Sequence, residues 1–75
     1  MNEKLEAAAA RFDALSLELE KARAHCAVAA AHFRAQEVPR GCAHAIAIRG
    51  HLLAASELLD AFAKAHSAQA TATQL

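Results

Sequence analysis

The chain has 75 residues, so it can form one small domain at most, and a chain of this size buries only about 60% of the surface that its unfolded form exposes. Alanine supplies 23 positions, Leu, Ile, Val, Phe and Met together supply 17, and there are one Pro, two Gly and no Trp or Tyr. This composition excludes a β-sandwich or barrel, which needs many turns and β-branched residues, and a disordered tail, which holds fewer apolar residues. Eight basic and eight acidic residues give a net charge of zero, so no basic field indicates a nucleic acid or an anionic membrane.

The first predicted element is a helix over about residues 2–38. Almost every residue in this range is a good helix former. Asn2 can cap its start, and Glu3 and Glu6 suit the positive end of the helix dipole. The chain shows neither a basic segment followed by an apolar core, which marks a signal peptide, nor an apolar run near the length of about 20 residues that a membrane span needs. We therefore expect a soluble, cytoplasmic protein with no membrane association.

The break in the helical pattern is Val38-Pro39-Arg40-Gly41, which predicts a turn over 38–41. The residue before a proline is pushed out of the α region, and proline is well placed at the first position of a new helix. A second helix then follows over about 40–66, and a small, polar tail over 67–75 is expected to fray. One long kinked helix is the competing interpretation.

Apolar residues in both helices recur at alternating steps of three and four, the pattern of a coiled-coil seam. If the chain reverses at the proline, Ala22 meets Ala55. His25 then meets His51, and His32 meets His44. Facing positions then have numbers that add to nearly constant values between 76 and 78, as an antiparallel pair requires. The predicted fold class is all-α, a single domain over 1–75 forming an Ala-rich, coiled-coil-like antiparallel hairpin. The seam residues are Leu5, Ala8, Phe12, Leu15, Leu19, Ala22, Cys26, Ala29 and Phe33 in the first helix, and Ala45, Ile48, Leu52, Ala55, Leu59, Phe62 and His66 in the second.

A second apolar stripe lies on the back of the first helix, and a lone hairpin cannot cover both faces. Exposed alanines can reflect helix propensity alone. The stripe can also pack against another chain, and a dimer of hairpins forming a four-helix bundle is the simplest closed arrangement. We favour this second interpretation, with a homo-oligomer or a helical protein as the partner. The predicted partner-binding residues are Leu17, Ala24, Val28, Ala31, Ala35, Ile46, Leu53 and Leu58.

Four histidines, His25, His32, His44 and His51, are spaced seven apart within each predicted helix and should flank the seam along one edge. They form a candidate metal site, with two imidazoles from each facing pair. Helical metal sites normally take ligands three or four positions apart, however, and residues seven apart are separated by about 10 Å. We therefore favour no metal and no other cofactor. The remaining interpretations are edge residues that cover the seam, a partner contact, or a response to pH.

Two cysteines in a chain without an export signal are expected to be reduced thiols. Cys26 falls in the seam, which predicts a small buried hydrophobic residue, and Cys42 opens the second helix. Their positions lie far from the hairpin register, so an intrachain disulfide is not expected. Cys42 with His44 could form a nucleophile pair, but the sequence shows neither a pocket nor an oxyanion donor set. We therefore expect no enzyme activity.

The layout of Leu19 to Phe62 resembles the small hairpin co-chaperones of type III secretion needle proteins, on the positions of Cys26, Phe33, Pro39 and Leu59. In that family two antiparallel helices act with a second chaperone to keep the needle subunit soluble. The histidine content departs from the family's pattern. The predicted function is a non-catalytic protein-interaction module, such as an adaptor, co-chaperone or regulator, that binds a partner helix through the outer face of the first helix. The alternatives are a metal-binding helical bundle and a small RNA-binding hairpin dimer.

Overall fold

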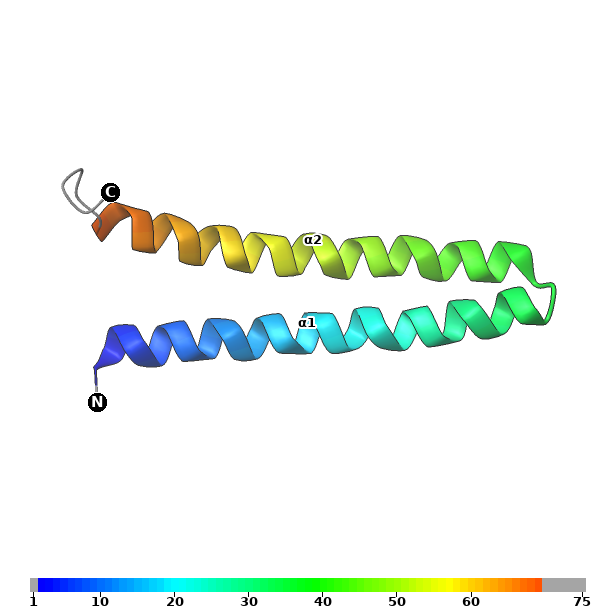
Figure 1. The fold of residues 1–75 in the computed structure, drawn as a ribbon, viewed down its shortest axis with the longest axis horizontal. Coiled ribbons are helices and arrows are strands. Elements are labelled where there is room, and N and C mark those ends of the chain that lie inside the picture. The colour runs from blue at the N-terminus through cyan, green and yellow to red at the C-terminus, as the bar shows by residue number, and fades with distance from the viewer. Residues whose placement is uncertain (1, 70–75) are drawn as a thin grey trace.

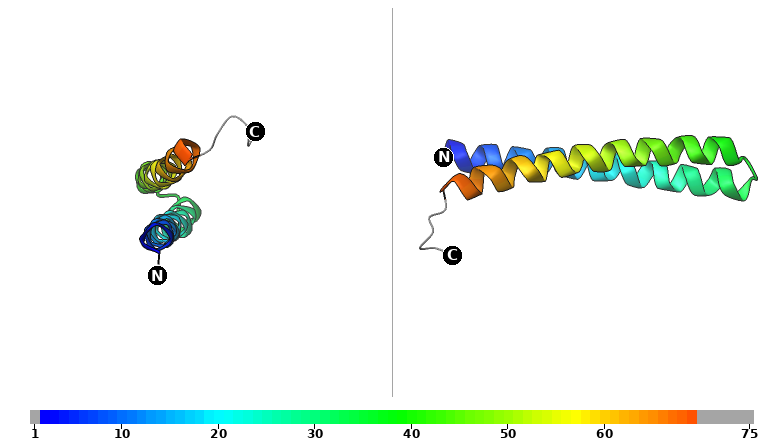
Figure 2. Two further views of the ribbon diagram at one scale, coloured as in Figure 1. Left: turned by 90° about the vertical axis from the view of Figure 1, so that its left-hand side faces the viewer. Right: turned by 90° about the horizontal axis from the view of Figure 1, so that it is seen from above.

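The chain forms two antiparallel α-helices, α1 (Glu3–Arg34) and α2 (Val38–Gln69), in a computed structural model that describes residues 2–69, with side chains described over 2–67. The helices run side by side along their whole length (Figure 1), and the end-on view shows two rods and no third layer in the described part of the chain (Figure 2). The radius of gyration is 17.4 Å, against about 11 Å for a compact domain of this length. The predicted all-α hairpin is confirmed, and the single kinked helix is wrong.

The start of α1 is capped as the sequence predicts. Asn2 has an extended backbone, and its Oδ1 accepts a hydrogen bond from the backbone N–H of Lys4 at 2.8 Å. Glu3 and Glu6 lie in the first turn, where their charges suit the positive end of the helix dipole.

The connection between the helices differs from the predicted turn at 38–41. The backbone N–H of Glu37 donates to the carbonyl of His32 at 2.8 Å, and that of Gln36 donates to Phe33 at 3.0 Å. Together with the left-handed conformation of Gln36 (φ 64°), these bonds form a Schellman motif that ends α1 at Arg34. The reversal therefore takes place over 35–37.

The helix boundaries shift accordingly. Pro39 lies within the first turn of α2 rather than in the reversal, because the backbone N–H that proline lacks has no intrahelical acceptor there. The second helix begins at Val38 and continues to Gln69, beyond the predicted end at about 66. Residues 67–69 of the predicted frayed tail are thus helical, and 70–75 lie outside the described residues.

The facing sides of the helices are organised in rows of residues spaced seven apart. Small side chains make up three of the four residues in the middle row of α1 and two of the four in that of α2. Ala22, Ala29 and Ala55 are 5–8% exposed, and Gly41 is buried against the ring of Phe33. Small residues at these levels let the two backbones approach closely. The middle rows are Ala8, Leu15, Ala22 and Ala29 in α1, and Gly41, Ile48, Ala55 and Phe62 in α2.

Two further rows flank the middle rows on opposite edges of the hairpin. Consecutive helical residues are about 100° apart, so neighbours such as His25 and Cys26 fall on either side of the middle row. One edge, the polar edge, consists of Arg11, Glu18, His25 and His32 with Glu37, His44, His51 and Leu58. The other, the apolar edge, consists of Leu5, Phe12, Leu19, Cys26 and Phe33 with Val38, Ala45, Leu52, Leu59 and His66.

Burial is the reverse of what a hairpin alone in water would favour. Every residue of the polar edge is half-buried, whereas every residue of the apolar edge is exposed. Among the side chains described, only three alanines form the buried hydrophobic core, and no large side chain is fully buried. The hairpin therefore has little core of its own.

The two glycines give a matched test of this packing. A Cβ on Gly41 would lie 2.6 Å from Cε2 of Phe33, whereas a Cβ on Gly50 would meet nothing within 4 Å. Gly50→Ala should raise the free energy of unfolding by about 0.5–1 kcal/mol, the usual helix preference of alanine over glycine. Gly41→Ala should lower it, because the ring must leave its contact. Urea unfolding followed by circular dichroism measures both, and equal gains at the two positions would contradict the Phe33–Gly41 contact.

The Schellman motif predicts a stabilising substitution. Gln36 has a positive φ of 64°, which costs an L-residue about 1–2 kcal/mol relative to glycine. Gln36→Gly should therefore raise the free energy of unfolding by about 1 kcal/mol. Ala35→Gly is the control, since Ala35 has an ordinary φ of −84° and should lose stability. A loss of stability in Gln36→Gly would place the reversal elsewhere.

Candidate functional site

The four histidines of the polar edge form one stack, which we call the histidine ladder: His51, His25, His44 and His32, alternating between α2 and α1. The ring centroids of His51 and His25 are 5.4 Å apart with planes at 20°, and those of His44 and His32 are 5.3 Å apart at 21°. His25 and His44 join the two pairs at 5.1 Å and 39°. The ladder thus crosses between the helices at every step.

A carboxylate closes each end of the ladder. Nδ1 of His51 lies 2.7 Å from Oε2 of Glu18, and Nδ1 of His32 lies 3.3 Å from Oε1 of Glu37. Because an ionised carboxylate only accepts hydrogen bonds, both imidazoles must donate from Nδ1. Arg40 in turn donates from Nη1 to Oε2 of Glu37 at 3.0 Å. The His51 and Glu18 side chains are 26% and 23% exposed, so this bond is partly shielded from water.

The centre of the ladder is a hydrogen bond between two imidazoles. Nδ1 of His25 lies 2.8 Å from Nδ1 of His44. One of these nitrogens must carry the hydrogen and the other must offer a lone pair, because two N–H groups would face each other without an acceptor. This contact therefore depends on at least one of the two rings staying neutral.

The predicted pairing of His25 with His51 and of His32 with His44 is confirmed by the stacked rings. The direct contact between His25 and His44 was not predicted, nor were the roles of Glu18 and Glu37. A signal was present in the sequence, since Glu18 precedes His25 by seven positions and Glu37 precedes His44 by seven. Heptad spacing places a residue on an edge, but it does not say which side chains turn toward each other.

Within residues 2–69, no group of three or more His, Cys, Asp or Glu side chains gathers in a way that could hold a metal ion. The fifth histidine, His66, lies apart from the ladder, with its ring 6.2 Å from that of Phe62.

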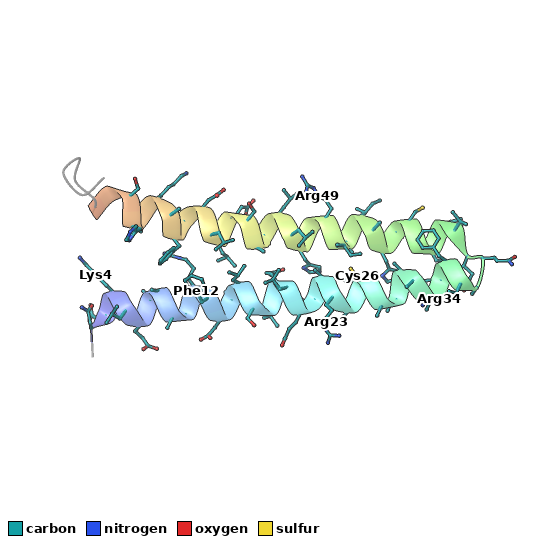
Figure 3. The ribbon with its side chains drawn as sticks, viewed as in Figure 1. Lys4, Phe12, Arg23, Cys26, Arg34 and Arg49 are labelled. Carbon is teal, nitrogen blue, oxygen red and sulfur yellow. The ribbon has the colours of Figure 1, made fainter. Side chains whose placement is uncertain are left out.

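Both cysteines are free and exposed. The predicted burial of Cys26 is therefore wrong. Its row lies on the apolar edge, beside the middle row of Ala22 and Ala29, and the other helix covers this edge only in part. Cys42 shares its heptad position with Arg49, which points away from α1 (Figure 3).

The predicted outer stripe lies on the backs of the helices. Leu17 is 50% exposed, Val28 41%, Ile46 76% and Leu53 48%. Ala24, Ala31 and Ala35 are exposed as well. Leu58 differs, because it is half-buried at the end of the polar edge, close to Arg11 and Leu15.

The apolar edge is a longer surface than the outer stripe and spans both helices. Leu5 is 66% exposed, and Phe12, Leu19, Leu52 and Leu59 are 42–47% exposed. Phe12 points from α1 toward α2 (Figure 3), where its ring meets that of Phe62 edge to face at 5.2 Å. Near the chain ends a groove of about 520 Å³ adjoins this edge, lined in part by Leu5, Ala8, Phe62 and His66.

No protein-family model, curated protein or solved structure matches the chain. Over the described residues, neither helix is long and apolar enough to span a lipid bilayer.

The end of the ladder can be tested with two neighbouring glutamates. Glu18→Ala removes the acceptor for His51 and should lower the free energy of unfolding by about 1 kcal/mol, the usual net contribution of one hydrogen bond. Glu20→Ala is the matched control, because Glu20 is exposed and should change stability by less than about 0.5 kcal/mol. Thermal unfolding at pH 7.5 measures both, and equal effects would contradict the Glu18–His51 contact.

Proposed function

We propose that the chain is a non-catalytic helix-packing interaction module whose apolar edge is covered by a second copy of the hairpin, giving a four-helix bundle. The observation that carries this proposal is the exposure of the whole apolar edge, while the polar edge is half-buried. Exposed apolar rows on two adjacent helices are typical of a surface that packs against other helices.

The solvent-accessible surface area of the hairpin supports a second hairpin as its partner. The chain exposes 5796 Å², whereas a compact protein of 7.9 kDa exposes about 4,400 Å². A compact globule of twice this mass exposes about 7,300 Å², so two hairpins that merge into one would bury about 4,300 Å². This area lies in the range of obligate homodimers, about 2,000–5,000 Å².

Symmetry and charge favour a second copy over a different protein. The two rows of the apolar edge run antiparallel with the same seven-residue spacing, so a two-fold rotation brings the row of one helix onto the row of the other. The net charge of zero means that two copies do not repel each other as whole molecules. The polar edge lies on the opposite side and stays in water in such a dimer.

The other predicted roles use different surfaces or partners. Binding of a partner helix through the outer face of α1 would use Leu17 and Val28 rather than the apolar edge. A co-chaperone role, as the resemblance to the needle-protein co-chaperones implies, would place a different protein on the hairpin. The metal-binding and RNA-binding alternatives stay predictions, as does a cytoplasmic location.

Two leucines of similar exposure separate these surfaces. Light scattering at tens of micromolar protein should give twice the 7.9 kDa chain mass. Leu19→Lys should give a monomer, because Leu19 is 47% exposed and burying that part contributes about 0.7–1.5 kcal/mol for each of the two leucines per dimer, so its loss weakens association by at least about 10-fold. Leu17→Lys on the outer stripe should stay dimeric. A monomeric wild type would overturn the proposal, and loss of the dimer in Leu17→Lys alone would place the interface on the outer stripe.

The two native thiols provide a second readout without mutation. Cys26 lies on the apolar edge and Cys42 outside it, and both are exposed in the single hairpin. At dimer-forming concentrations a maleimide should label Cys42 quickly and Cys26 slowly. In Leu19→Lys both should react quickly. Equal labelling of the two thiols in a dimeric wild type would show that the interface lies away from the apolar edge.

A further inference from the structure

We infer that the histidine ladder is a protonation-sensitive clasp, which joins α1 to α2 when its imidazoles are neutral and releases them in mild acid. This inference goes beyond the proposed function, because the ladder lies on the edge opposite the apolar edge and joins the helices of one chain. It rests on the geometry of the four rings and on the hydrogen-bond chemistry of imidazole.

The central bond sets the limit on proton binding. With Nδ1 of His25 2.8 Å from Nδ1 of His44, the pair can hold one hydrogen between the two facing nitrogens. One added proton is accommodated, because the charged ring then donates its Nδ1–H to the neutral ring. A second added proton charges both rings and makes both facing nitrogens donors, which removes the hydrogen bond and places two positive rings at a centroid distance of 5.1 Å. The closed ladder therefore excludes at least one proton that separated imidazoles would take up.

The charges around the ladder favour protons at its ends and not at its centre. Glu18 and Glu37 contact the two outer rings, so a positive charge on His51 or His32 is balanced by a carboxylate. Arg40 also forms an ion pair with Glu37, which reduces the stabilisation that this carboxylate gives to a charged His32. On α1, Lys21 lies within one helical turn of both Glu18 and His25 and adds further positive charge near the centre.

Once the outer rings are charged, each inner ring also stacks on a cation. His25 stacks on His51 at 5.4 Å, and His44 stacks on His32 at 5.3 Å. Like charges at such short distances repel, so each added proton at the centre favours separation of the helices. The ladder spans the half of the hairpin next to the reversal, between Glu18 and Glu37, and its opening would free that half.

The direction of the pH effect follows from proton counting. The unfolded chain can protonate both rings of the central pair, whereas the closed ladder can charge only one of them, so this pair makes stability fall as pH falls. The carboxylates at the two ends favour protons on the outer rings and act in the opposite direction. An unfolded imidazole titrates near pH 6.5. Each excluded proton therefore raises the unfolding equilibrium constant by about 30-fold between pH 7.5 and pH 5.

Urea unfolding followed by circular dichroism, at constant ionic strength and with EDTA present, tests this effect. Between pH 7.5 and pH 5 the ratio of the wild-type unfolding constant to that of His44→Gln should rise by about 30-fold. His44→Gln removes one imidazole of the central pair and leaves the carboxylates at both ends in place, so the ratio isolates the central pair. His66→Gln is the matched control, since His66 lies outside the ladder, and should follow the wild type.

A direct proton count covers the case in which His44→Gln does not fold. Unfolding of the wild type at pH 5.5 by urea should take up close to one proton per chain or more, measured by pH-stat titration. Proton release or no uptake would overturn the inference. So would a pH effect that is present in EDTA-free samples and vanishes with EDTA, which would assign it to loss of a bound metal. The Leu19→Lys monomer should show the same uptake, so failure of the clasp is distinguishable from failure of the proposed dimer.

Discussion

The close approach of two rows of small side chains is the contact on which the rest of this hairpin depends. Ala22 and Ala29 of α1 and Ala55 of α2 are the buried hydrophobic residues of the described chain. Near the reversal, Gly41 has no side chain and so leaves room for the Phe33 ring. Larger side chains at these levels would push the helices apart. Because these residues recur every seven positions, they also fix the register, and the register decides which edge residues meet across the pair.

The same small contacts leave the hairpin short of buried apolar surface. A buried alanine contributes little apolar surface area to the core, and the larger side chains, such as Leu19 and Leu52, lie half-exposed on one edge. Two-helix hairpins have little interior, so stability has to come from the edges or from another chain. In this chain the histidines and glutamates of the polar edge form hydrogen bonds with one another, whereas the apolar edge is only partly covered. That asymmetry links the fold to the proposed dimer.

The two proposed roles would respond to different conditions. The proposed association through the apolar edge would depend on protein concentration and change little with mild acid, because most members of this edge are apolar. The proposed clasp would depend on protons and not on concentration, because it joins helices of one chain. A protein with both features would lose the pairing of its own helices in acid while its apolar surface became more exposed. The proposals therefore concern separate surfaces that meet in one small fold.

The sequence by itself determined the helical class, the reversal near Pro39, the antiparallel register and the pairing of His25 with His51, because these follow from composition and seven-residue spacing. Only the tertiary structure decided the place of the reversal at 35–37. The left-handed residue after α1 is Gln36 and not a glycine, so the sequence does not mark this helix end. It also decided that Cys26 is exposed and that Glu18 and Glu37 close the histidine ladder. Spacing assigns a residue to a face, whereas burial and hydrogen bonds depend on how far the other helix covers that face and on which way each side chain turns.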